Sequence, residues 1–133
     1  MTGMIVIDAS AILDVLLRTS VAKDVEARLS AAGQTIHAPY LLDVEVAQVI
    51  RRRAIFGNID SKRGLAALSD LSSMPIRRYP HEFLLPRVWE LRNNLTAYDA
   101  VYVALAEAID APLLTRDRRI TNAAGHHAQI EVV

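Results

Sequence analysis

The sequence predicts an α/β fold, a three-layer α/β/α sandwich in which helices cover both faces of a central parallel sheet. Two observations support this prediction. Short apolar runs, typical of buried strands, alternate along the chain with longer segments whose apolar residues recur every three or four positions, the period of a helix. Strands that alternate with helices pair in parallel, because each helix returns the chain to the same end of the sheet.

The first half of the chain begins with an apolar run over residues 4–8, which predicts a short buried strand that closes on Asp8. The apolar-periodic residues after it predict a helix directly behind the strand. Further helices and one short strand follow. The elements expected here are a strand over 4–8, helices over 10–18 and 21–32, a strand over 35–38, and helices over 41–55 and 60–73.

The second half continues the alternation. Residues 100–106 carry no charge, so their helix should be buried nearly all round. Pro86 fits only near the start of its helix, because proline lacks the N–H that a helix interior needs. The elements expected here are a strand over 76–79, helices over 84–94 and 97–109, a strand over 112–115, a short helix over 119–124 and a strand over 129–133.

Composition limits what the chain can be. With 133 residues, 52% of them hydrophobic, and no linker or repeat, it should form a single domain over residues 1–133 with a sizeable core. No segment approaches the roughly 18 apolar residues that span a bilayer, and the N-terminus lacks a signal-like pattern, so a cytoplasmic location is expected. The net charge of +0 argues against a protein that coats nucleic acid by bulk electrostatics.

Acidic residues follow two of the expected strands. Asp8 closes the first strand, and Asp117 comes just after the strand over 112–115. In an open parallel sheet, ligands bind in the crevice outside the carboxyl ends of the strands, which is where both side chains should lie. Each has a structural alternative, because an Asp in this position often N-caps the next helix.

Two further acids lie in helices. Glu45 shares a helix face with Leu41 and Val49, so no base one turn away can pair with it, and a face of this kind should point inward. A buried charge without a partner is costly, so the partner must come from elsewhere in the fold. Asp99 lies in the first turn of its helix, where it also fits a capping box with Thr96.

One divalent cation would satisfy all four acids at once. The ligands offered are oxygens, with no cysteine in the chain and no histidine pair at metal-binding spacing, which favours a hard cation such as Mg²⁺ or Mn²⁺ over zinc. Such cations can supply a nucleophilic water, relieve charge on phosphoryl oxygens and assist the leaving oxygen in phosphodiester hydrolysis. A phosphatase or phosphoryl-acceptor domain is disfavoured, because residue 10 is Ser rather than a second acid and no lysine is suitably placed.

These residues resemble a known family. The Asp of VIDAS, a Glu in a helix about a third of the way along, the phrase LTAYDAVYVALA, and LLTRDRRI followed by IEVV together look like a PIN domain. The LTAYDA phrase is similar to the VapC-type toxins of bacterial type II toxin–antitoxin systems. The resemblance spans nearly the whole chain, from Val6 to Val133.

The resemblance implies a PIN-like fold and a Mg²⁺- or Mn²⁺-dependent endoribonuclease that hydrolyses RNA phosphodiesters by a metal-activated water. The residues that match the family's four catalytic, metal-binding acids are Asp8, Glu45, Asp99 and Asp117. Ser10 matches the family's small hydroxyl residue near the metal, although it could equally N-cap the first helix, and Thr115 occupies a supporting position. Asp14 has no counterpart and is expected to be solvated or to face a partner.

Partners follow from the same resemblance: an RNA substrate, a cognate antitoxin and a second copy of the chain in a homodimer. Arg51, Arg52 and Arg116 are candidate contacts to RNA phosphates beside the acids, although arginines at a helix end are also favoured by the helix dipole. In the family, the region of helices 21–32 and 60–73 forms the dimer contact and the antitoxin groove. Packing of these helices on their own core would give the same apolar pattern.

Two other functions remain open. The chain could be a PIN nuclease that processes RNA without an antitoxin, or a catalytically silent binding module with the same fold.

Overall fold

The computed structural model describes residues 3–31 and 33–133. Its centre is a five-stranded, all-parallel sheet in the order β3-β2-β1-β4-β5. The strands are β1 (Gly3–Ile7), β2 (Gln34–Pro39), β3 (Ile76–Tyr79), β4 (Leu113–Thr115) and β5 (Ile130–Val132). The predicted parallel α/β sandwich is confirmed.

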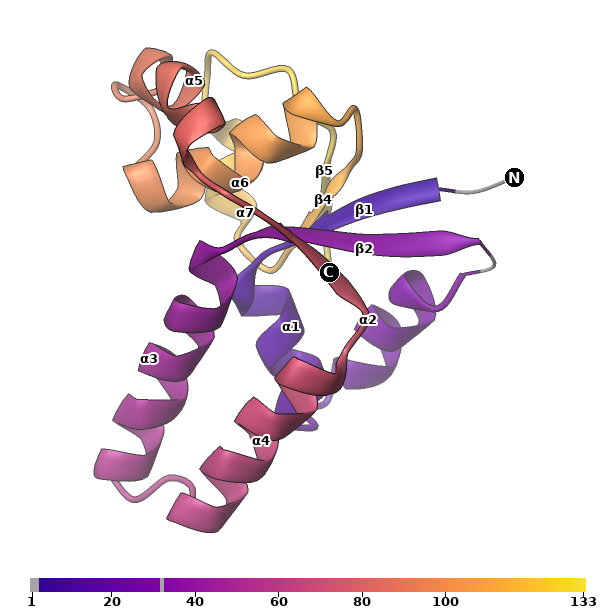
Figure 1. The fold of residues 1–133 in the computed structure, drawn as a ribbon, viewed down its shortest axis with the longest axis vertical. Helices are drawn as coiled ribbons and strands as arrows, with labels where there is room; N and C mark the ends of the chain where they lie inside the picture. Colours follow the sequence, from indigo (N-terminus) through magenta and orange to yellow (C-terminus); the bar gives the residue numbers. More distant parts are fainter. Residues whose placement is uncertain (1–2, 32) are drawn as a thin grey trace.

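Helices form a layer on each side of the sheet (Figure 1). Helices α1 (Ala9–Leu16), α2 (Ala22–Leu29), α3 (Leu41–Ile55) and α4 (Ser61–Ser73) pack on one another on one side. On the other side lie the 3-10 turn η1 (Glu82–Leu84), α5 (Leu85–Glu90) and α6 (Ala97–Ala108), while the short helix α7 (Arg118–Asn122) contacts β5. No helix among the described residues is long and apolar enough to cross a membrane.

β1, β4 and α6 contribute much of the core, together with apolar residues of β2 and of α1 to α4. Ile5 and Ile7 on β1 and Leu113 on β4 are fully buried, and every residue from Ala100 to Ala106 is buried, as the uncharged run predicts. This burial fixes α6 against the centre of the sheet. The first turn of α6 therefore lies beside the carboxyl ends of the strands.

Three expected helices end early. The helix expected over 10–18 ends at Leu16, because Arg18 adopts a left-handed backbone with φ of 56° that a helix cannot continue through. The helix expected over 21–32 ends at Leu29, and its last expected position, residue 32, lies outside the described residues. The helix expected over 84–94 begins as the 3-10 turn, and α5 ends at Glu90, where successive turns replace it. The other elements match within one or two residues.

Candidate active site

The edge of the sheet at the carboxyl ends of the strands holds two of the four predicted acids. Asp8 follows β1 directly and N-caps α1, with its carboxylate accepting the backbone N–H of Ala11 at 3.1 Å. Asp117 follows β4 and N-caps α7, accepting the N–H of Arg119 at 2.9 Å. Because β1 and β4 are parallel neighbours, both acids lie at the same edge. The capping explanation is therefore correct for both, and it leaves their remaining oxygen lone pairs for other partners.

Asp8 is the most enclosed of the four acids, with 7% of its surface exposed. Its Oδ1 accepts the hydroxyl of Ser10 at 2.6 Å, and its Oδ2 accepts the hydroxyl of Thr115 at 2.5 Å. Burial raises the pKa of the Asp8 carboxyl above its usual value, these hydrogen bonds oppose the shift, and the charge of Asp99 adds to it. The carboxylate is thus held in one orientation in a place that disfavours its charge.

The two hydroxyl residues form a bridge between the strand ends. The Ser10 and Thr115 oxygens lie 3.3 Å apart. Each also accepts a backbone N–H of the segment after β4: Ser10 from Arg116 at 3.0 Å, and Thr115 from Asp117 at 3.0 Å. Asp8, rather than Ser10, is the N-cap of α1. The two hydroxyls therefore lock Asp8 to the loop that carries Asp117.

Glu45 lies between the core and the solvent, so the expected inward-facing stripe is only partly correct. The buried residues of α3 are Leu42, Val46 and Ile50, and Glu45 is half-buried along one side of that row. Its partner is the hydroxyl of Tyr102, which donates to Oε1 at 2.6 Å. Burial raises the pKa of Glu45, the Tyr102 hydrogen bond opposes the shift, and the charges of Asp8 and Asp99 reinforce it.

Tyr102 was not identified from the sequence, because a tyrosine within an apolar helix is usually a core residue. It is 2% exposed, and its pKa is raised by burial and by its hydrogen bond to Glu45. The signal available was its spacing, three residues after Asp99 on α6, which places the two on neighbouring positions of the helix surface.

Asp99 is half-buried in the first turn of α6, whose N-cap Thr96 accepts the Asp99 N–H at 3.2 Å. The pKa of Asp99 is raised by burial and by the charge of Asp117, and Arg119 opposes this shift. Asp117 differs from the other three acids, because Arg119 binds both of its oxygens, at 3.0 and 2.8 Å, and holds its pKa below the usual value.

The four acids therefore interact electrostatically at one sheet edge. Burial raises the pKa values of Asp8, Glu45 and Asp99, and the negative charge of neighbouring acids adds to each shift. Among residues 3–31 and 33–133, no three acidic or histidine side chains already converge closely enough to hold a metal ion. The chemistry of the donors, oxygen throughout and negatively charged, fits a hard divalent cation, but the carboxylates do not form a closed ligand shell.

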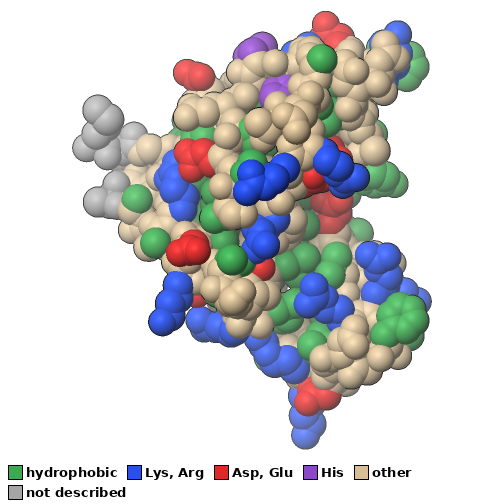
Figure 2. Space-filling model, turned by 180° about the vertical axis from the view of Figure 1, so that it is seen from behind, with side chains coloured by type: hydrophobic (Ala, Val, Ile, Leu, Met, Phe, Trp, Pro, Cys, Tyr) green, Lys and Arg blue, Asp and Glu red, His purple; other side chains and the backbone are tan. Residues whose placement is uncertain are grey.

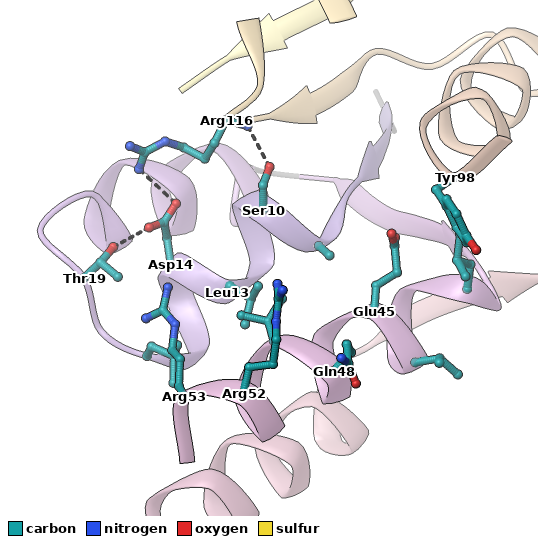
Figure 3. Close-up of a pocket in the computed structure, with 15 residues that line it drawn as sticks. Ser10, Leu13, Asp14, Thr19, Glu45, Gln48, Arg52, Arg53, Tyr98 and Arg116 are labelled. Atoms are coloured by element: carbon teal, nitrogen blue, oxygen red, sulfur yellow. Dashed lines mark hydrogen bonds and ion pairs between the residues drawn. The ribbon is translucent and has the colours of Figure 1, made fainter. Parts of the chain in front are cut away.

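A cavity of about 730 Å³ begins at Ser10 and Glu45 and runs between α1 and α3 (Figure 3). Its lining includes the apolar side chains of Leu13, Leu17 and Val49, and also several arginines. Of the candidate phosphate contacts, Arg52 and Arg116 line the cavity and Arg51 does not. Arg53, the third arginine of the cluster that follows Glu45 in the sequence, lines it as well.

The sequence interpretation of Asp14 is wrong. The residue expected to be solvated or partner-facing is 8% exposed and lies within the cavity wall. Its carboxylate accepts the Thr19 hydroxyl at 2.6 Å and pairs with Arg116 at 3.0 Å (Figure 3). Because Arg116 is 102 positions away in the sequence, no local pattern indicated its contact with Asp14. Asp14 thus holds the arginine in the lining of the cavity.

One face of the molecule is mixed in charge. Seen from behind, basic side chains group around the middle of the molecule, with acidic and apolar side chains exposed between them (Figure 2). This agrees with the net charge of +0. Any contact to a polyanion must therefore be local, through particular arginines, rather than through a uniformly basic face.

Comparison with known proteins gives a consistent result. The family model described as PIN domain matches residues 5–126. The chain is 41% identical over 130 residues to Ribonuclease VapC12 of Mycobacterium tuberculosis, covering 98% of this chain and 99% of the relative. It is 42% identical over 130 residues to VapC ribonuclease Mb0985 of Mycobacterium bovis, covering 98% of each.

Solved structures share the fold. PAE2754 from Pyrobaculum aerophilum superposes with a TM-score of 0.70 at 25% identity, covering 98% of this chain and 84% of that one. The structure of VapBC2 from Rickettsia felis, bound to a DNA fragment from their promoter, gives a TM-score of 0.74 at 12% identity and covers 97% of this chain and 98% of that one.

Proposed function

This chain belongs to the PIN-domain family, and from that premise we propose that it is a divalent-metal-dependent endoribonuclease acting as the toxin of a toxin–antitoxin pair. The relatives that cover nearly its whole length are named ribonucleases. The observation that carries the proposal is the set of four interacting carboxylates at the carboxyl edge of the sheet, three of them with raised pKa values. In a nuclease site of this type, the combined negative charge of the carboxylates is balanced by a cation.

The acids have distinct roles in this proposal. Asp8 and Asp99 are direct ligands of Mg²⁺ or Mn²⁺, and Glu45 and Asp117 bind directly or through water, since Mg²⁺ keeps several waters in protein sites. Ser10 and Thr115 are supporting residues that hold the Asp8 carboxylate in one orientation by hydrogen bonds.

The chain itself supplies the charge and the contacts for the reaction. When bound, one or two cations would activate a water and relieve charge on the phosphoryl oxygens. Tyr102 keeps Glu45 oriented toward the other acids through its 2.6 Å hydrogen bond. Arg52 and Arg116, at the cavity that adjoins the acids, bind neighbouring phosphates of the RNA. Arg51 does not line this cavity and is the weaker candidate.

The proposed partners are a cognate antitoxin and a second copy of the chain. Solved relatives include VapBC complexes, among them VapBC2 of Rickettsia felis. Among the apolar residues of α2 and α4, Val25, Leu29 and Leu71 are buried in the chain's own core and Leu68 packs against it, as packing alone would explain. Leu65 on α4 is 71% exposed and is available to a partner. Within the family, the alternative function is RNA processing without an antitoxin. The proposed location of the protein is the cytoplasm.

The first test is metal binding, which needs no knowledge of the RNA target. Mn²⁺ or Mg²⁺ is added to the purified chain, and thermal unfolding is followed for the wild type, Asp8→Asn and Asp99→Asn. At about 100 times its Kd, a ligand stabilises the native state by roughly 2.7 kcal/mol, which raises Tm by several degrees. The wild type should respond and both variants should respond weakly.

Asp110→Asn is the matched control, because Asp110 is exposed, lies beyond the C-terminal end of α6, and has a φ of 52° that Asn also tolerates. It should respond as the wild type does. Metal-dependent cleavage of labelled RNA, abolished by EDTA and by Asp99→Asn, would complete the case. A folded wild type that binds neither metal in calorimetry would remove the nuclease proposal and favour a silent binding module.

A further inference from the structure

Tyr98 presents a large aromatic ring to solvent beside the proposed catalytic acids. It is 63% exposed, directly precedes Asp99 in the first turn of α6, and lines the same cavity as Glu45. Figure 3 shows its ring across the cavity from the Glu45 side chain. An exposed aromatic ring next to a catalytic site indicates a recognition surface more strongly than one standing alone.

The position of the ring is fixed by its neighbour one turn further along the helix. Tyr98 and Tyr102 are four residues apart, so they share one face of α6 and lie about 6 Å apart along the axis. Tyr102 donates to Glu45 on α3, which shows that this face of α6 points at α3. Tyr102 is enclosed there with 2% exposure, while Tyr98 is left open at the mouth of the same interface.

The opposite wall comes from α3. Val44 and Gln48 are one turn apart, lie on either side of Glu45, and line the cavity together with Tyr98. Val44 is 67% exposed. The Gln48 amide offers both hydrogen-bond donors and an acceptor. An apolar ring, an aliphatic side chain and an amide are the groups with which proteins hold an unpaired nucleobase.

We propose that Tyr98, Val44 and Gln48 form a subsite for one unstacked nucleobase of the RNA, next to the phosphate that the acids hydrolyse. This inference rests on the proposed function and names its substrate as single-stranded. The ring stacks on the base, and the Gln48 amide bonds the base edge. Arg52 and Arg116 in the same cavity complement neighbouring phosphates, which favours a nucleic acid over an apolar peptide as the occupant.

The test measures RNA affinity in an Asp8→Asn background, so that the RNA is bound but not cut. A short, fluorescently labelled single-stranded RNA of randomised sequence is titrated against this parent and against the parent carrying Tyr98→Ala, Tyr98→Phe or Trp89→Ala. Trp89 is the control, because it is 67% exposed on α5 and does not line the cavity. Each titration is repeated over a range of salt concentrations.

Tyr98→Ala should weaken RNA binding about 5- to 100-fold, the usual effect of losing one base stack, while Tyr98→Phe and Trp89→Ala bind as the parent does. The slope of log Kd against log salt should stay unchanged in Tyr98→Ala, because no phosphate contact is lost, whereas Arg52→Ala should reduce it. A Tyr98→Ala protein that binds RNA as tightly as its parent would overturn the subsite and leave the nuclease proposal intact, and the ring would then serve a protein partner. Loss of affinity in Tyr98→Phe as well would overturn the stacking role. If the parent binds no RNA and the wild type neither binds nor cuts it in the presence of Mn²⁺, the proposed function falls together with the subsite.

Discussion

Removal of the Tyr102 hydroxyl is expected to destabilise the protein in a pH-dependent way. Tyr102 is almost fully buried, and its hydroxyl donates to the Glu45 carboxylate at 2.6 Å. Tyr102→Phe deletes that donor and changes little else of the packing. Glu45 would then keep its half-buried position without its hydrogen bond, so its pKa should rise further above the usual value.

The expected loss follows from the charge of the acceptor. A hydrogen bond to a charged group contributes about 1.5–3 kcal/mol and one to a neutral group about 0.5–1.5 kcal/mol. Because Glu45 is only half-buried, the lower part of the first range applies at neutral pH, about 1.5 kcal/mol, or a fall in Tm of roughly 5 °C. When Glu45 is protonated at low pH, the loss should shrink to about 0.5 kcal/mol.

The direction of the pH dependence follows from the raised pKa of Glu45. Since the pKa of Glu45 in the folded protein lies above its unfolded value, the group contributes stability at low pH that is lost as the pH rises through the folded pKa. The Tyr102 hydrogen bond limits this loss of stability. The free energy of unfolding of Tyr102→Phe should therefore fall further below that of the wild type as the pH rises from about 4 to 7.

The assay is chemical denaturation of the metal-free wild type, Tyr102→Phe, Glu45→Gln and the double variant at both pH values. Tyr98→Phe is the control, because its hydroxyl belongs to an exposed residue, and it should match the wild type within about 0.5 kcal/mol. A coupling energy near zero between Tyr102→Phe and Glu45→Gln, or an equal loss of stability at both pH values, would refute the claim that the Tyr102 hydroxyl stabilises the charged Glu45 carboxylate.

Three further outcomes are expected. Mn²⁺ affinity measured by calorimetry should rise with pH from about 5 to 7.5, because the three carboxyls with raised pKa values must lose their protons to bind a cation; a flat profile would contradict the site. Arg119→Ala should bind Mn²⁺ a few-fold more tightly than Arg118→Ala, because only Arg119 occupies both oxygens of Asp117; equal affinities would show that it does not compete with the metal. Arg87→Ala should lower the free energy of unfolding by about 2 kcal/mol in denaturation, because it leaves the nearly buried Glu107 carboxylate without its 2.7 Å partner; a loss under 0.5 kcal/mol would count against that contact.

Much of the fold could be predicted from the sequence, because its signals are local. The apolar runs and helical periods predict every strand and helix within one or two residues at most ends, and the uncharged segment Ala100–Ala106 is buried as expected. The early ends of α1 and α5 were missed because they depend on single backbone conformations and turns, such as the left-handed Arg18, that leave the apolar period unchanged.

The candidate acids could also be named from the sequence. A carboxylate at the end of a strand, or on an apolar stripe, stands out against its immediate neighbours, and the order of the strands in a parallel sheet brings their carboxyl ends together. This reasoning placed Asp8 and Asp117 at one edge. It did not distinguish the environments of these two acids. Asp8 is buried and its pKa is raised, whereas Arg119 binds Asp117 and lowers its pKa.

Only the tertiary structure decided which partner each polar group has. Tyr102 with Glu45 and Arg116 with Asp14 join residues that are 57 and 102 positions apart. His81 likewise accepts the backbone N–H of Leu41 at 2.8 Å and so caps α3, a role that no spacing suggested. The periodicity of a sequence reports which side of an element is apolar, because that depends on backbone geometry alone. The identity of the group across the interface depends on how the layers pack, and hence on the whole fold at once.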